Sequence, residues 1–246
     1  MTSPPPPTSA FVLAAGMGQR MRPLTNTIPK PLVALGGKPL IDHVLDRLSA
    51  AGIKKVVVNV HYLADQIESH LSKRTKPKIV FSDERKRLLD TGGGVIHALP
   101  KLGAGPFVIH NSDSVWIEGL GSNLDRLLCT WDPDAMDSLM LVAPLAASIG
   151  YDGLGDFKMD PAGRLTRQTG PKMAPFVFAG VSIAHPRLFE GAPTGAFSLN
   201  KLWDKAIDRG KLFGLRLEGI WMHVGTPDAL AEAEATLTEP LTTSSD

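Results

Sequence analysis

The sequence predicts an α/β fold, with a Rossmann-like, mostly parallel sheet that carries helices on both faces and a small antiparallel subregion. The first observation is that, up to residue 145, short apolar or β-branched runs alternate with amphipathic stretches of helical period. The second is that the first apolar run stops abruptly at a glycine-containing loop, as a buried strand does. The third is a change of period after residue 150, where short runs flank a turn signal and predict antiparallel strands.

The spacing of apolar residues predicts the strands and helices of the parallel part of the sheet. The run Lys55–Val60 is short and β-branched, whereas Leu40–Ala51 has apolar residues at helical spacing and is followed by Gly52. On the same grounds we expect further strands over Phe11–Ala15, Ile79–Phe81, Pro106–Ser112 and Ser138–Leu145, and further helices over Leu63–Leu71, Val95–Leu99 and Leu120–Trp131. Such an alternation predicts a parallel sheet that is covered on both faces.

The later part of the chain has a different pattern. Asp156–Asp160 and Arg164–Thr166 flank the turn signal Pro161-Ala162-Gly163, which predicts a hairpin. Further strands are expected over Phe176–Ile183 and Leu212–Leu217, and helices over Phe197–Ile207 and Asp228–Leu237. We assign Trp203, in the first of these helices, to the core and not to a platform for a ligand.

Composition limits the classes of function. The chain has 246 residues, of which 43% are hydrophobic, so it is long enough for one generous α/β domain and general disorder is excluded. Its 26 basic and 25 acidic residues give a net charge of +1, which predicts neither a nucleic-acid partner nor a membrane partner. Cys129 is the single cysteine and suits a reducing compartment, and no signal peptide or apolar span is evident. We therefore expect a cytoplasmic protein.

The domain organisation is predicted to be simple. Residues 1–9 are rich in proline and are expected to form a disordered tail. Residues 10–238 are expected to form a single domain, and residues 239–246 a polar tail.

The stretch Phe11–Leu35, FVLAAGMGQRMRPLTNTIPKPLVAL, has the features of a polyphosphate site. The predicted strand ends at Gly16, where the missing side chain permits a turn with positive φ, and Gly18 follows. Two such glycines let a large anion lie on backbone N–H groups, and arginines in the same loop can grip phosphate oxygens through paired donors. Lys30, between two prolines, adds a further cation.

The pattern LAAGxGxRMRPLT, followed by PKPL and GKPLI, resembles the opening signature of the sugar-1-phosphate nucleotidyltransferases. It matches neither the P-loop motif nor the dinucleotide-binding motif. The resemblance implies the nucleotide-diphospho-sugar transferase fold and makes Arg20, Lys30 and Asp113 the catalytic residues. It implies that the glycine loop wraps a nucleoside triphosphate, with Arg20 on its β and γ phosphates and Lys30 at the reacting centre. The nucleotide-binding set that follows from it is Leu13, Ala14, Ala15, Gly16, Gly18, Gln19, Arg20, Thr91, Gly92, Gly93 and Asn111.

A second glycine cluster occurs in the string LLDTGGG, Leu88–Gly94, immediately before a predicted helix. Glycines that open a helix offer bare N–H groups and the positive end of the helix dipole. In the resembled family this stretch lies over the nucleobase, and the LLDTGGG form is similar to members that handle N-acetylmuramate 1-phosphate with UTP. The alternative is a flexible hinge that makes no contact with the base.

Asp113 follows the predicted strand Pro106–Ser112 at its carboxyl end, where ligands of open α/β sheets collect. The pair Asn111-x-Asp113 resembles a family element whose aspartate holds the catalytic Mg²⁺. One well-placed carboxylate is enough to anchor Mg²⁺, because phosphate oxygens and water complete its coordination. The alternative is that Asp113 caps the following turn.

The sugar-binding set implied by the resemblance is less regular. Segments around Asp156 and Gly180 resemble those that contact the sugar in the family, and Asn200 completes the set with Lys172. The family's EKP motif is not cleanly present. Lys172 could supply its lysine, and an ordinary surface lysine is an equal alternative.

The string Trp221–Pro227, WMHVGTP, resembles a family WxDVGTP element whose aspartate is the second Mg²⁺ ligand, but here His223 replaces the aspartate. The resemblance implies Mg²⁺ as the cofactor. Because imidazole suits Mn²⁺, Co²⁺ or Zn²⁺ better than Mg²⁺, Mn²⁺ is the alternative. Three interpretations of His223 stay open: contact with the metal through water, donation to the sugar phosphate, or a site that binds nucleotide without turnover.

The resemblance implies transfer of a nucleotidyl group from a nucleoside triphosphate to a sugar 1-phosphate, with release of pyrophosphate. UTP and N-acetylmuramate 1-phosphate, in cell-wall sugar recycling, are the expected substrates. Mannose 1-phosphate with GTP, or glucose 1-phosphate with UTP or dTTP, are alternatives. A catalytically silent nucleotide-sugar-binding protein is the alternative from another class. A monomer or homodimer is expected.

Overall fold

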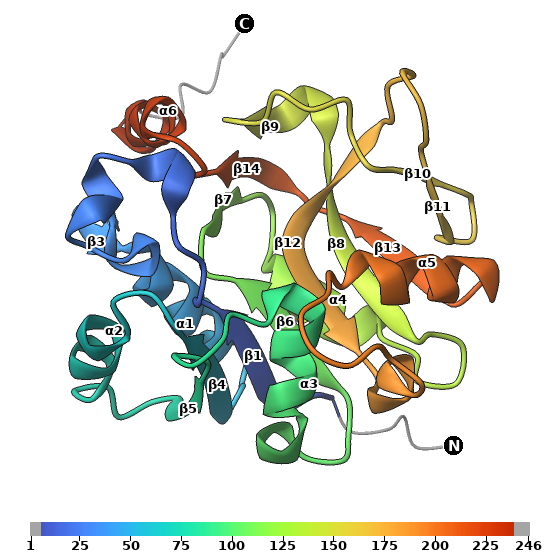
Figure 1. Ribbon diagram of the computed structural model, residues 1–246. Coiled ribbons are helices and arrows are strands. Elements are labelled where there is room, and N and C mark those ends of the chain that lie inside the picture. Colours follow the sequence, from blue (N-terminus) through green and yellow to red (C-terminus); the bar gives the residue numbers. More distant parts are fainter. Residues whose placement is uncertain (1–5, 239–246) are drawn as a thin grey trace, which may run out of the picture.

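A nine-stranded sheet runs through the computed structural model, which describes residues 6–238 (Figure 1). One half of this sheet is wholly parallel, in the order β5-β4-β1-β6. Its strands are β1 (Ser9–Leu13), β4 (Lys55–Val60), β5 (Lys78–Asp83) and β6 (Phe107–Asn111). Helices separate these strands in the sequence, so the predicted Rossmann-like part is confirmed.

Among the described residues, the first five helices cover both faces of the main sheet, whereas the sixth belongs to a separate core cluster. The helices are α1 (Leu40–Ala50), α2 (Ala64–Leu71), α3 (Asp90–Leu102), α4 (Asn123–Thr130), α5 (Asn200–Asp208) and α6 (Pro227–Thr238). Side chains of α1, α2 and α4 share one core with Val12, whereas those of α3 and α5 share the other core with Phe11. Because successive residues of a strand point to opposite faces, β1 contributes to both cores.

The other half of the sheet is mostly antiparallel. Strand β12 (Phe176–Ala184) pairs antiparallel with β6 and with β8 (Ser138–Pro144), and β13 (Leu212–Arg216) runs parallel to β8. The predicted hairpin is present as β10 (Phe157–Met159) and β11 (Leu165–Arg167) and continues the sheet beyond β12. The change of period after residue 150 therefore marks a real change from parallel to antiparallel pairing.

A second, three-stranded sheet was not predicted. It consists of β7 (Ser114–Glu118), β14 (Gly219–His223) and β9 (Ser148–Ile149), and β14 lies between the other two. A two-stranded ribbon of β2 (Ala34–Leu35) and β3 (Lys38–Pro39) precedes α1. Short 3₁₀ helices span Gln19–Met21, Leu24–Asn26, Lys30–Leu32, Leu145–Ala147 and Pro186–Phe189. The small sheet holds both Asp113, just before β7, and His223, at the end of β14, beside the main sheet.

Several predicted boundaries need correction. The sheet begins before the predicted domain start at Ala10, because Ser9 pairs with Lys55 and the Thr8 carbonyl accepts from the Lys54 and Lys55 N–H groups. Residues 1–5 and 239–246 of the predicted tails lie outside the described residues. Helix α4 begins only after Ser122, whose hydroxyl accepts from the Asp125 N–H, and α5 begins three residues later than predicted. Between residues 6 and 238, no helix has the length and apolar character that crossing a membrane requires.

Candidate active site

Two cavities meet at the carboxyl edge of the parallel strands. We call them the loop cavity, of about 530 Å³, and the aromatic cavity, of about 270 Å³. Their shared wall contains Leu13 at the end of β1, Asn111 at the end of β6, Asp113, and Thr91 at the start of α3. A ligand with two parts could therefore occupy both cavities at once, with its junction beside Asp113.

The loop cavity brings together most of the residues that the resemblance implied for nucleotide binding. It is lined by the loop after β1 and by the cations predicted for catalysis, and the predicted residues among its walls are Leu13, Ala14, Ala15, Gly16, Gly18, Gln19, Arg20, Lys30, Thr91, Asn111 and Asp113. A single concave surface thus combines a glycine loop, two cations and two carboxylates, those of Asp90 and Asp113. This is an arrangement suited to an anion with several phosphates.

Asn59, which the sequence analysis missed, holds this loop in place. Its Oδ1 accepts from the N–H groups of Ala14, at 2.7 Å, and Ala15, at 3.2 Å. Its Nδ2 donates to the buried carboxylate of Glu84 at 2.7 Å. The Ala14 and Ala15 amides are therefore already occupied. Among the hydrogen bonds of residues 6–238, the N–H groups of Gly16, Met17 and Gly18 have no acceptor and remain for a ligand.

The positive φ predicted at Gly16 is found at Gly18 instead, so the two loop glycines have different roles. Gly18, and not Gly16, has positive φ, at 61°, and a Cβ there would lie 3.0 Å from Cγ2 of Thr25. A Cβ on Gly16 would meet no atom within 4 Å. Gly18 is thus required by backbone conformation and packing, whereas Gly16 leaves open space at the wall of the loop cavity.

Lys30 and Asp113 form an ion pair where the two cavities meet, with Lys30 Nζ donating to Asp113 Oδ2. Both side chains are largely buried, at 12% and 19% exposed. Burial alone would raise the pKa of the Asp113 carboxyl, but the charge and hydrogen bond of Lys30 outweigh it and hold that pKa below its ordinary value. Asp113 is therefore an ionised carboxylate with one oxygen not engaged by Lys30.

The glycine cluster at the start of α3 does not offer the bare N–H groups that we predicted. The N–H groups of Gly92 and Gly93 donate to the Phe197 carbonyl, at 2.8 and 3.3 Å. A Cβ on Gly92 would lie 2.3 Å from the Phe197 ring, and one on Gly93 would lie 2.2 Å from the Gly195 carbonyl oxygen. These glycines permit close packing of the segment before α5, and neither lines the two cavities. Thr91 lines both.

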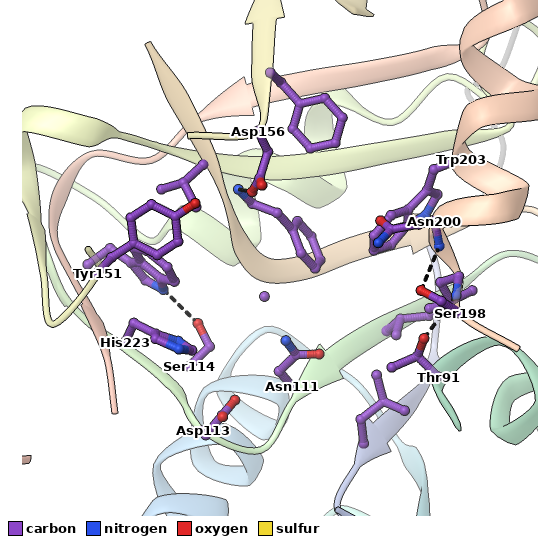
Figure 2. A pocket seen from close by; sticks show the side chains of 18 of the residues that line it. Thr91, Asn111, Asp113, Ser114, Tyr151, Asp156, Ser198, Asn200, Trp203 and His223 are labelled. Carbon is purple, nitrogen blue, oxygen red and sulfur yellow. Dashed lines mark hydrogen bonds between the residues drawn. The ribbon is translucent and has the colours of Figure 1, made fainter. Parts of the chain in front are cut away.

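The aromatic cavity lies between the main sheet, α5 and the small sheet (Figure 2). Figure 2 shows Tyr151 and His223 on one side of it, Asn200 and Trp203 on the other, and Asn111 with Asp113 below them. Trp203 is 6% exposed and packs edge-on against Phe178, with 4.9 Å between ring centroids. The core assignment of Trp203 was thus incomplete, since its ring is also a wall of the cavity.

The predicted sugar-binding residues divide into two groups. Asp156, Gly180 and Asn200 line the aromatic cavity, whereas Lys172 is exposed on the surface and lines neither cavity. The cavity also has walls that sequence reasoning missed, among them Tyr151, Arg167 and Ser198. The signal for Asn59 was present as a lone polar residue inside a β-branched strand. Nothing comparable marked Tyr151, Arg167 or Ser198.

Gly180→Ala should destabilise the fold. Gly180 has φ of 78° at the irregularity of β12 between Phe178 and Val181, and a Cβ there would lie 2.6 Å from Ser114 Cβ. An alanine there would have both a strained, left-handed backbone and a steric overlap with Ser114. Together these should lower the free energy of unfolding by about 2–4 kcal/mol. The matched control is Gly170→Ala, with φ of 80° and no atom within 4 Å, which should cost only the strain. Thermal unfolding would measure both, and an equal loss in the two variants would contradict the packing argument.

His223 lines the aromatic cavity but not the loop cavity. Its ring folds back over Gly225, where a Cβ would lie 2.7 Å from His223 Nε2, and it stands 5.6 Å from the Trp221 ring. Burial, assisted by Lys30 and Arg20 and opposed by Asp113, lowers the pKa of His223, so the neutral imidazole is favoured. Across residues 6–238, no group of three or more His, Cys, Asp or Glu side chains is arranged to hold a metal ion.

His110, behind this site, belongs to the scaffold. Its ring stacks on Trp116 at 5.6 Å, and Arg47 lies over the same indole at 4.2 Å. His110 Nδ1 is 2.7 Å from the Asn111 carbonyl oxygen and is assigned as the donor. Burial, opposed by this hydrogen bond, lowers the pKa of His110 to about 3.

His110→Phe should make the free energy of unfolding depend less strongly on pH below pH 7. Between the ordinary pKa of 6.5 and the folded value of about 3, the unfolded chain binds a proton that the folded chain does not. As the pH is lowered through this range, the free energy of unfolding should therefore decrease by up to about 1.4 kcal/mol per pH unit from this group alone. Phenylalanine keeps the stacked ring and removes the titration. Melting temperatures from pH 7 to 4 should fall less in this variant than in His97→Gln, which alters an exposed histidine; equal slopes would contradict this interpretation.

Comparison with known proteins agrees with this geometry. The model of the family described as nucleotidyl transferase matches residues 9–133. The chain belongs to this family, and within it to the sugar-1-phosphate nucleotidyltransferases, which confirms the resemblance seen in the opening loop.

Two curated relatives have the same printed name, N-acetylmuramate alpha-1-phosphate uridylyltransferase. The one from Caulobacter vibrioides is 47% identical over 95% of this chain and 98% of its own length. The one from Neisseria meningitidis is 33% identical over 92% of this chain and 96% of its own length. A crystal structure of UDP-glucose pyrophosphorylase complexed with UDP-glucose has a TM-score of 0.73 at 16% identity, covering 94% of this chain and 98% of that one, and supports the fold.

Proposed function

We propose that the chain transfers a uridylyl group from UTP to N-acetylmuramate 1-phosphate, giving UDP-N-acetylmuramate and pyrophosphate for the recycling of cell-wall sugar. The observation that carries the proposal is the meeting of two cavities at the Lys30–Asp113 pair, in a chain two of whose relatives carry that activity in their names. The loop cavity would bind UTP, and the aromatic cavity would bind the sugar.

The chemistry follows from bringing two anions together. An oxygen of the sugar phosphate forms a bond to the α-phosphorus of UTP, the bond from that phosphorus to the bridging α–β oxygen breaks, and pyrophosphate carries the electron pair away. The sugar phosphate is already ionised, so no side chain needs to become covalently attached. Lys30 and Arg20 neutralise the repulsion and orient the phosphates, while the free amides of Gly16 and Gly18 bind their oxygens.

We propose that Asp113 also holds the divalent cation, Mg²⁺ with Mn²⁺ as its alternative. The donor set fits a hard cation, because one ionised carboxylate stands where phosphate oxygens from both substrates would supply further ligands. When bound, such an ion would withdraw negative charge from the phosphate oxygens and orient the phosphate groups for the reaction. His223 lines only the aromatic cavity, which favours donation from its neutral imidazole to the sugar phosphate over a place among the metal ligands.

The test is a matrix of sugar 1-phosphates and nucleoside triphosphates, each pair incubated with the chain and Mg²⁺ or Mn²⁺, with release of pyrophosphate as the readout. We expect N-acetylmuramate 1-phosphate with UTP to be turned over fastest. Faster turnover of mannose 1-phosphate with GTP, or of glucose 1-phosphate with UTP or dTTP, would replace the proposed substrates. Tight binding of UTP without pyrophosphate under every condition would support the silent binding protein instead. The cytoplasmic location and the monomeric or homodimeric state stay predictions.

A further inference from the structure

Arg167, at the end of β11, is the cation of the aromatic cavity. Among the described residues that line this cavity it is the only Lys or Arg side chain, and the carboxylates of Asp113 and Asp156 line the same space. Nothing in the transfer chemistry described above uses Arg167. A cation in such a cavity calls for a negative group on the ligand that is not the reacting phosphate.

The guanidinium of Arg167 is held in one orientation. Its Nε donates to Asp204 Oδ1 at 2.6 Å, its Nη2 donates to Asn200 Oδ1 at 3.2 Å, and it lies over the Phe157 ring at 4.9 Å. Both N–H groups of Nη1, and the second N–H of Nη2, have no acceptor among the hydrogen bonds of residues 6–238. One N–H of Nη1 and the second N–H of Nη2 together form an edge of the guanidinium that can bind a carboxylate through two parallel hydrogen bonds.

Asp204 does not use up this cation. Its side chain is 52% exposed, against 25% for that of Arg167, so water screens the pair on the outer side. The contacts with Asp204 and Asn200 therefore act mainly to orient the guanidinium. Figure 2 shows Asn200, a partner of Arg167, on the side of the cavity away from His223 and Tyr151. The phosphate of a bound sugar would lie beside Asp113, leaving the far side of its ring for Arg167.

We propose that Arg167 binds the lactyl carboxylate of N-acetylmuramate and so selects this sugar over N-acetylglucosamine. The two sugars differ by the lactyl ether at C3, which carries the one charge of the molecule outside its phosphate. In a cavity with two aspartates, that carboxylate needs a fixed cation. This inference rests on the proposed function and names the residue that gives it its specificity.

The experiment compares Arg167→Gln with the parent chain on N-acetylmuramate 1-phosphate and N-acetylglucosamine 1-phosphate, both with UTP. Loss of a charge-assisted pair should lower kcat/KM for the first sugar about 10- to 100-fold, mainly through KM, and change kcat/KM for the second by less than about 2-fold. The matched control is Arg164→Gln. Arg164 lies on the same hairpin and also packs over an aromatic ring, that of Phe213, but it does not line the cavity. It should leave both values unchanged.

A second measurement uses the unmodified chain with the lactyl carboxamide analogue of the sugar phosphate. We expect the same loss as in Arg167→Gln, and no additional loss when the variant and the analogue are combined. If the parent chain uses N-acetylmuramate 1-phosphate and Arg167→Gln keeps its preference, or loses both sugars equally, the inference is wrong and the proposed function stands. If the parent chain does not turn over N-acetylmuramate 1-phosphate at all, the proposed function itself fails.

Discussion

Asp113→Asn should lower kcat by at least about 10²- to 10³-fold. Asparagine keeps the size of the side chain but removes the one ionised carboxylate at the junction of the two cavities. Without that charge the proposed anchor for a divalent cation is lost, and Lys30 loses its ionic partner. The loop amides and Arg20 are untouched, so UTP should still bind.

Pyrophosphate release and calorimetric binding of UTP together measure this prediction. The control is Asp65→Asn, which removes a carboxylate that also pairs with an arginine but is 95% exposed and lines neither cavity. It should keep parental activity. Retention of more than about a tenth of kcat by Asp113→Asn would remove Asp113 from the catalytic set, because a loss of that size is smaller than one transition-state donor contributes.

The parts of the site that the sequence predicted are those that local sequence specifies. The loop Gly16–Gly18, Arg20 and Lys30 follow one strand within twenty residues, and they all line one cavity. Asp113 was found because a residue just beyond a parallel strand must lie at the carboxyl edge of the sheet. Chain order was enough to place these residues.

Long-range pairing explains what the sequence analysis missed. Asn59 reaches the Ala14 and Ala15 amides only because β4 lies beside β1 in a particular register. The amides of Gly92 and Gly93 were predicted to be free because their acceptor, Phe197, lies more than a hundred residues further along the chain. A glycine cluster therefore indicates close approach without revealing whether a ligand or another segment approaches.

The aromatic cavity could be assembled from sequence only in part, for the same reason. Its walls come from the loop before β10, from β12, from α5 and from β14. The resemblance marked Asp156, Gly180, Asn200 and His223, but no local motif marked Tyr151, Arg167 or Ser198. Trp203 has the spacing of a core residue and is one, yet it also lines the cavity. Burial and ligand contact are not exclusive at a large aromatic ring.

Lys30→Met should also lower kcat, by about 10²- to 10³-fold, because it removes a fixed cation from the proposed centre of phosphate transfer. The control is Lys38→Met, which breaks a similar ion pair, with Asp46, on the surface. Pyrophosphate release should distinguish the two variants, and thermal unfolding should show that Lys30→Met remains folded. If both lysine variants kept parental activity, the assignment of Lys30 would be wrong.

The double variant Lys30→Met, Asp113→Asn tests whether the two residues act as one unit. In the free chain the two charges neutralise each other, and each single change leaves the other charge desolvated without its partner. Residues in direct contact are seldom additive, so the double variant should be no more than about 10-fold less active than the worse single variant. Its melting temperature should exceed that of Lys30→Met, because neither charge then remains buried alone. Fully additive losses in activity would mean that the two residues act at separate steps, and that their ion pair is only a resting contact.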